Sequence, residues 1–106
     1  MSYAFYILKC VDDTYYTGLT KDLEARVREH EVGARPEAYT FSRRPVKLVW
    51  SIVTESYQEA FQWERRIKGW SRAKKEALIR GDIEEIHEIV KDERKRRDQK
   101  KKQTSR

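Results

Sequence analysis

Arg26 and His30 are the first side chains in this sequence whose types and spacing suggest chemistry. They stand four residues apart in a helix predicted over residues 22–32, so they lie on the same helix face. Leu23 and Val27 share that face, which places the pair at the border of the hydrophobic core. An arginine there either extends its guanidinium to solvent or has an anionic partner, and the forked guanidinium matches a carboxylate of the protein or a phosphate.

Glu64 is the second unusual position, because it falls on the apolar stripe of a helix predicted over residues 56–68. Ala60 and Ile67 belong to that stripe, and an unpaired carboxylate among such residues is costly. Two interpretations stay open at this point. Glu64 either forms a structural ion pair, with Arg26 or a neighbouring lysine, or it binds a metal ion.

Two tyrosines, Tyr6 and Tyr16, lie on the two arms of a predicted hairpin. If both phenols serve one site, they must project from the same face of the hairpin, because strand side chains alternate with a period of two. A two-residue loop would place them on opposite faces. A three-residue loop over residues 11–13 would pair Tyr6 with Gly18 and Tyr16 with Leu8, so that the rings become neighbours. We therefore expect that loop, a longer odd loop, or a bulge.

The remaining pattern predicts one α/β domain of the α+β type, with a three-stranded antiparallel sheet flanked by helices. The expected strands cover residues 3–10, 14–19 and 46–53, and the expected helices cover residues 22–32, 56–68, 71–80 and 82–97. We expect the domain to span residues 1–81, with a C-terminal helix and a basic tail over residues 82–106.

The third expected strand follows a loop over residues 34–45 that is long for so small a domain, and long loops are often functional. Along the strand, alternate residues are apolar: Val46, Leu48, Trp50 and Ile52. This period of two predicts that all four side chains lie on one buried face.

The formal net charge of +6 comes from the end of the chain. Residues 91–106 hold nine basic and three acidic residues, whereas residues 1–90 hold fifteen of each. Such a tail either contacts phosphates or is a solvated terminus. No apolar run approaches the ~20 residues of a membrane span, and the N-terminus lacks a signal-peptide pattern. Together with a single cysteine, Cys10, these features predict a cytoplasmic protein without membrane association.

Five sequence landmarks follow one another in a characteristic order. They are "AFY" at 4–6, "YTG" at 16–18, "GLTKDLEARVREH" at 18–30, "AYTFSRRPVKLVW" at 38–50 and "EAFQWERRIKGWSRAKKEALI" at 59–79. In this order they resemble the GIY-YIG endonuclease superfamily, and most of all its small stand-alone single-domain members. The first motif keeps Tyr6, although Ala4 and Phe5 stand where the family has Gly and Ile.

The resemblance implies a metal-dependent endonuclease that hydrolyses phosphodiester bonds in DNA, with a role in DNA repair or processing. The implied site consists of Tyr6, Tyr16, Arg26, His30 and Glu64. Glu64 would bind Mg²⁺ or Mn²⁺ as the protein ligand, Arg26 would stabilise charge on the phosphate, and Tyr16 would hold the phosphate or the water. Either Tyr6 or His30 would act as the base.

A second interpretation of the same resemblance is a nucleic-acid-binding module with little or no turnover that acts with a partner protein. Basic residues in the long loop, Arg43 and Arg44, and others after Glu64 would add affinity for phosphates without reading sequence. The complete set of five site residues favours the endonuclease.

Overall fold

The computed structural model describes residues 2–82, 84, 85, 88 and 95 and divides into two compact units, Met1–Gly69 and Trp70–Arg106. The elements of the first unit are β1 (Tyr3–Lys9), β2 (Tyr15–Thr20), α1 (Leu23–Val32), η1 (Phe41–Arg43), β3 (Lys47–Thr54) and α2 (Tyr57–Lys68), and the second unit holds α3 (Arg72–Arg80). The predicted helix over residues 82–97 and the basic tail lie largely outside the described residues. Within those residues, no helix combines the length and apolar character that crossing a membrane requires.

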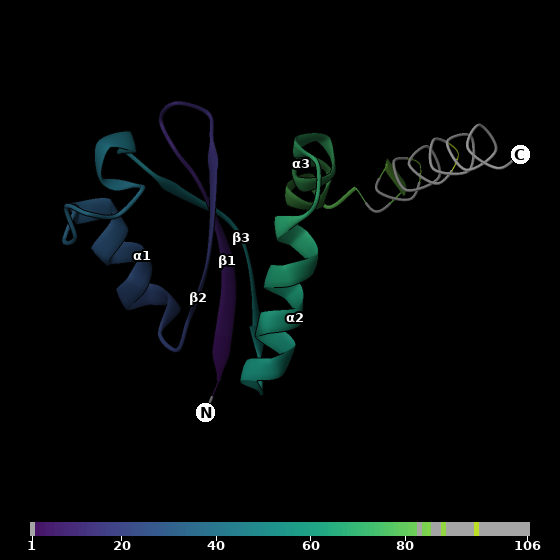
Figure 1. Cartoon of the computed structure of the whole chain (residues 1–106), viewed down its shortest axis with the longest axis horizontal. Helices are drawn as coiled ribbons and strands as arrows, with labels where there is room; N and C mark the ends of the chain where they lie inside the picture. The colour runs from purple at the N-terminus through teal and green to yellow at the C-terminus, as the bar shows by residue number, and fades with distance from the viewer. Residues whose placement is uncertain (1, 83, 86–87, 89–94, 96–106) are drawn as a thin grey trace, which may run out of the picture. The chain divides into compact units, whose positions relative to one another are not determined.

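The sheet of the first unit has the strand order β2-β1-β3, and both strand pairs are antiparallel. This arrangement confirms the predicted three-stranded α+β fold. Helices α1 and α2 lie on opposite faces of the sheet (Figure 1). The central strand β1 is therefore buried on both faces, which explains why its sequence is a continuous apolar run rather than an alternating one.

The two faces of β1 contribute to different parts of the core. Tyr6, Leu8 and Cys10 point towards α1, where they pack with Val27. Phe5 points the opposite way, and its ring contacts Trp50 with the centroids 6.0 Å apart. Alternation along one strand thus divides the aromatic residues between the α1 side and the α2 side of the sheet.

The hairpin between β1 and β2 has the register that the two tyrosines require. Tyr6 pairs with Gly18 and Leu8 pairs with Tyr16, and the connecting loop contains Val11 to Asp13. Asp13 adopts a left-handed conformation with φ of 67°, as is usual for the last residue of a three-residue hairpin loop. The rings of Tyr6 and Tyr16 lie on the same face with their centroids 6.4 Å apart, so the prediction is confirmed.

The prediction that alternate residues of the third strand share one face was wrong. β1 pairs Ile7 with Trp50 but Leu8 with Leu48, so Val49 is an extra residue in β3 and forms a β-bulge. Leu48 consequently faces α1, whereas Trp50 faces α2 and contacts Trp63 with a centroid distance of 5.7 Å. Because apolar residues cover both faces of the strand here, the sequence pattern gives no sign of the inserted residue.

Side-chain caps begin α1, α2 and α3, and each cap residue is the first residue of the range predicted for its helix. Asp22, Ser56 and Ser71 each accept a hydrogen bond from the backbone N–H three residues later. α1 ends at Gly33, whose φ of 69° favours a residue without a side chain.

Gly18 is required by the position of the Tyr6 side chain across the β1–β2 pair. A Cβ atom at residue 18 would lie only 2.5 Å from Cζ of the Tyr6 ring, which is a steric clash. We therefore expect Gly18→Ala to lower the free energy of unfolding by about 1–3 kcal/mol in urea denaturation, because either strand or ring must shift.

Gly69→Ala provides the matched control for this substitution. Gly69 has φ of −84°, and the nearest heavy atom to an added Cβ is 3.8 Å away. Its free energy of unfolding should stay within about 0.5 kcal/mol of the wild type or rise slightly. Equal destabilisation by the two substitutions would contradict the steric role of Gly18.

Candidate functional site

A chain of hydrogen bonds connects three segments of the first unit behind the candidate site. The Tyr6 hydroxyl lies 3.1 Å from Nε2 of His30, and Nδ1 of the same ring lies 2.7 Å from the Thr40 hydroxyl. Tyr6 and Thr40 are fully buried. A neutral imidazole carries one N–H and one free nitrogen, so the ring donates one of these hydrogen bonds and accepts the other. These two hydrogen bonds fix the orientation of His30 between β1 and the loop after α1.

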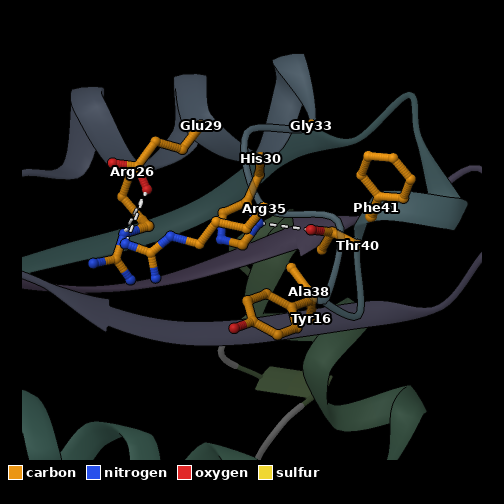
Figure 2. A pocket seen from close by; sticks show the side chains of 9 residues that line it. All are labelled: Tyr16, Arg26, Glu29, His30, Gly33, Arg35, Ala38, Thr40 and Phe41. Atoms are coloured by element: carbon orange, nitrogen blue, oxygen red, sulfur yellow. Dashed lines mark hydrogen bonds and ion pairs between the residues drawn. The ribbon is translucent and has the colours of Figure 1, made fainter.

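Tyr16, unlike Tyr6, is only partly buried and presents its phenol to a pocket (Figure 2). Its ring lies 5.1 Å from the ring of His30 and stacks on Tyr39, measured between centroids. No hydrogen bond involves the Tyr16 hydroxyl within the described part of the chain. The two motif tyrosines therefore differ in kind: one is a buried support and the other is available to a ligand.

The pocket is small, about 70 Å³, and is formed by α1, β2 and the loop after α1. Its lining consists of Tyr16, Arg26, Glu29, His30, Gly33, Arg35, Ala38, Thr40 and Phe41. The Glu29 carboxylate lies between two guanidinium groups, with Oε2 3.4 Å from Arg26 Nε and 3.6 Å from Arg35 Nη2. Glu29 is thus the anionic partner that the position of Arg26 requires.

Burial keeps the Tyr6 phenol and the His30 imidazole in their neutral forms at neutral pH. Burial, together with the neighbouring Tyr16, raises the pKa of Tyr6 to about 12, although the Arg26 guanidinium acts in the opposite direction. Burial and then the positive charge of Arg26 lower the pKa of His30. Tyr6 is therefore protonated at neutral pH, whereas His30 is an unprotonated imidazole that can accept a proton.

Glu64 is not among the residues that line the pocket. It belongs to α2, which covers the sheet face opposite to α1 (Figure 1). Its half-buried side chain places Oε1 3.7 Å from Lys68 Nζ, and Lys68 is exposed. Within residues 2–82, no hydrogen bond or ion pair joins Glu64 to the pocket. Nor do the described residues contain any group of three or more side chains that would suit a metal ion.

The arginines of the long loop have structural contacts of their own. Arg43 donates to the Asp12 carboxylate at 3.1 Å and to the carbonyl of Tyr39 at 2.9 Å, and its guanidinium lies over the Tyr39 ring. Arg44 lies over Phe41 and donates to its carbonyl oxygen at 2.9 Å. These contacts hold the loop that carries Thr40 against the hairpin.

Three polar residues of the pocket, Glu29, Arg35 and Thr40, were not predicted from the sequence. Glu29 is three residues after Arg26, so its carboxylate is a natural helix neighbour of that guanidinium. Arg35 and Thr40 belong to the loop whose length indicates a function, but length alone does not identify the residues that face the site.

The lowered pKa of His30 predicts a pH-dependent stability. Below the ordinary histidine value of about 6.5, the unfolded chain takes up a proton that folded His30 does not. The free energy of unfolding should then decrease as the pH falls from 7 to 5, by up to about 1.4 kcal/mol per pH unit. His30→Gln should show a flatter dependence over this range in urea denaturation. Equal slopes for the two proteins would contradict the lowered pKa.

Comparisons with known proteins identify the family of the chain. The model of the GIY-YIG catalytic domain matches residues 2–77. A UPF0213 protein of Natronomonas pharaonis is 47% identical over 74 residues, covering 70% of this chain and 86% of the relative. One of Bacillus pumilus is 41% identical over 90 residues, covering 82% and 91%. The solution NMR structure of a UPF0213 protein from Bacillus halodurans matches with a TM-score of 0.50 and 40% identity, covering 74% and 83%. The chain therefore belongs to the GIY-YIG domain family, among its small UPF0213 members.

Proposed function

We propose that this protein is a metal-dependent endonuclease that hydrolyses phosphodiester bonds in DNA during repair or processing. The observation that carries the proposal is the convergence of Tyr16, Arg26 and His30 on one pocket of net positive charge. These groups come from β2 and α1, and they bring a cation, a phenol and a neutral imidazole together at one small pocket. A phosphodiester is the ligand that all three can serve at once.

The proposal assigns different roles to the pocket residues. Arg26 binds the phosphate and stabilises the charge that develops on it, because its fork can contact two phosphate oxygens. Tyr16 holds the phosphate or the attacking water through its hydroxyl. His30 is the favoured base, since it lines the pocket as a neutral imidazole. Both of its nitrogens are hydrogen-bonded, so it accepts a proton from water only when its bond to Tyr6 or Thr40 opens.

Tyr6 is a positioning residue in this mechanism. Its phenol is fully buried, does not line the pocket and has a pKa raised to about 12, so it is poorly suited to deprotonate water directly. Its hydrogen bond to Nε2 orients the imidazole instead. When His30 accepts a proton, the adjacent phenol oxygen can accept a hydrogen bond from the imidazolium.

Glu64 is the residue that would bind the divalent metal ion. It offers one carboxylate, which is 3.7 Å from the exposed Lys68 ammonium, and a single carboxylate suits Mg²⁺, which keeps most of its water ligands. The donor set is therefore compatible with Mg²⁺ or Mn²⁺ and unsuited to a metal that needs several protein ligands. When bound, the metal would neutralise charge on the phosphate and on the leaving oxygen.

Because β2 is at the edge of the sheet, a substrate that crosses this edge can reach both the pocket and Glu64. Among the described residues, β2 pairs with β1 alone, and α2 contacts β2 from the sheet face opposite to α1 (Figure 1). A nucleic acid strand lying across this edge would meet Tyr16 and Arg26 on one face and the α2 side on the other. Exposed basic residues in the last turn of α2, Arg65, Arg66 and Lys68, would contact its phosphates.

A nucleic-acid-binding module without turnover is the second candidate, and the separation of Glu64 from the pocket favours it. The two candidates are distinguished by a cleavage screen over single-stranded, duplex, flapped and branched DNA, and RNA. The screen compares Mg²⁺ or Mn²⁺ with chelator, and circular dichroism verifies that the protein is folded. Metal-dependent cleavage supports the endonuclease, whereas binding without cleavage of any substrate supports the module.

Glu64→Gln tests the metal-binding role directly. This substitution keeps size and hydrogen bonding but removes the negative charge, so we expect cleavage to fall at least about 100-fold. DNA affinity in chelator and thermal stability should remain near the wild-type values. Glu59→Gln, an exposed position in the first turn of the same helix, is the matched control and should retain activity. Near-normal cleavage by Glu64→Gln would reject the assignment.

A further inference from the structure

We propose that Arg26 and Arg35 together form a binding site for one phosphate group, and that the Glu29 carboxylate occupies this site in the free protein. The inference rests on the proposed function for the identity of the ligand. It adds a second substrate-binding arginine and an internal competitor, both of which the sequence analysis missed. The geometry of these three side chains at the mouth of the pocket carries the proposal.

Both guanidinium groups are directed at the same oxygen atom. Glu29 Oε2 lies 3.4 Å from Arg26 Nε and 3.6 Å from Arg35 Nη2. Figure 2 shows the Arg35 side chain extending across the pocket, so that its guanidinium lies beside that of Arg26. Two like charges held this close repel each other, and they need an anion between them.

The end of α1 brings Arg35 to this place. Gly33 adopts a left-handed conformation with φ of 69°, and its N–H donates to the Glu29 carbonyl oxygen. Ala34 N donates to the same carbonyl oxygen at 3.0 Å. The chain therefore turns back over the last turn of the helix, which directs Arg35 towards the side chain of Glu29. The helix terminus thus fixes the backbone position from which the Arg35 side chain reaches the pocket.

Glu29 is a poor ligand for the two arginines. Its contacts of 3.4 and 3.6 Å are longer than the roughly 2.7–2.9 Å of good charge-assisted hydrogen bonds. Oε2 is shielded from solvent and yet makes no hydrogen bond in the described part of the chain. A phosphate has more oxygen atoms in a tetrahedral arrangement, so it can offer each guanidinium its own acceptors.

Displacement of Glu29 then becomes part of substrate binding. The carboxylate keeps the two arginines oriented while the pocket is empty of substrate, which lowers the ordering cost when a phosphate arrives. It also competes with that phosphate, so it weakens the binding of isolated anions. A polynucleotide that makes further contacts elsewhere overcomes this competition more easily than a free phosphate does.

The test is a titration with inorganic phosphate in chelator at constant ionic strength, followed by the Nε–Hε and backbone amide signals in NMR spectra of the ¹⁵N-labelled chain. Glu29→Gln should tighten the apparent Kd by roughly 2- to 20-fold, because it removes the competing charge. Arg35→Gln should weaken it by a similar factor. In the double variant that carries both substitutions, Glu29→Gln should tighten the phosphate Kd by a smaller factor. The reason is that Arg35, one of the two guanidinium groups that Glu29 occupies, has been removed.

Glu24→Gln is the matched control. Glu24 is on the same helix, and its substitution removes the same charge. Its carboxylate pairs with Arg28 at 3.7 Å and does not line the pocket. Its phosphate Kd should stay within about 1.5-fold of the wild type at constant ionic strength. Equal tightening by Glu24→Gln and Glu29→Gln, or no weakening by Arg35→Gln, would overturn the proposal.

Failure of this proposal and failure of the proposed function give different results. If the phosphate titrations follow the expected pattern but no nucleic acid is cleaved, the oxyanion site stands and the endonuclease falls. If cleavage occurs while the phosphate Kd is insensitive to both Glu29→Gln and Arg35→Gln, the endonuclease stands and the arginine pair falls. Amide spectra of each variant verify that the fold is retained.

Discussion

The hydrogen bond between Tyr6 and His30 is the interaction on which the rest of the site depends. It joins the central strand of the sheet to α1, and both partners are buried, so losing either would leave an unsatisfied polar group at a cost of about 1–3 kcal/mol. The phenol reaches His30 only because Gly18 has no side chain beneath it. The hairpin register, the glycine and the helix position are therefore parts of one constraint rather than separate features.

The same arrangement gives the two tyrosines of the sheet different roles: one supports the site from within, and the other can contact a ligand. Tyr6 is in the middle of the sheet and is covered, whereas Tyr16 is on the edge strand β2 and remains partly exposed. Two phenols on one face thus have different surroundings merely because their strands differ in position. Only the edge phenol can touch a ligand, and the central one acts through the imidazole.

Most of the fold was predictable from three features of the sequence: the odd length of the hairpin loop, the residues that cap the helices, and the spacing of the apolar residues. The requirement that Tyr6 and Tyr16 share a face determines an odd loop, and Asp13 tolerates the left-handed conformation that such a loop needs. The bulge at Val49 was not predictable, because apolar residues are acceptable on both sides of that strand. Arg35 escaped prediction for a different reason: its position depends on the direction in which the chain leaves α1, which residue types alone do not specify.

The charges of the pocket follow from which groups are buried. Burial keeps Tyr6 and His30 neutral at neutral pH, so the charge of the pocket comes from the two arginines and Glu29. Because one carboxylate is shared by two guanidinium groups, a net positive charge remains for an incoming anion. Protonation of His30 would add to that charge and strengthen the hold on the phosphate. The group that accepts a proton in the proposed reaction would thereby stabilise the negative charge beside it.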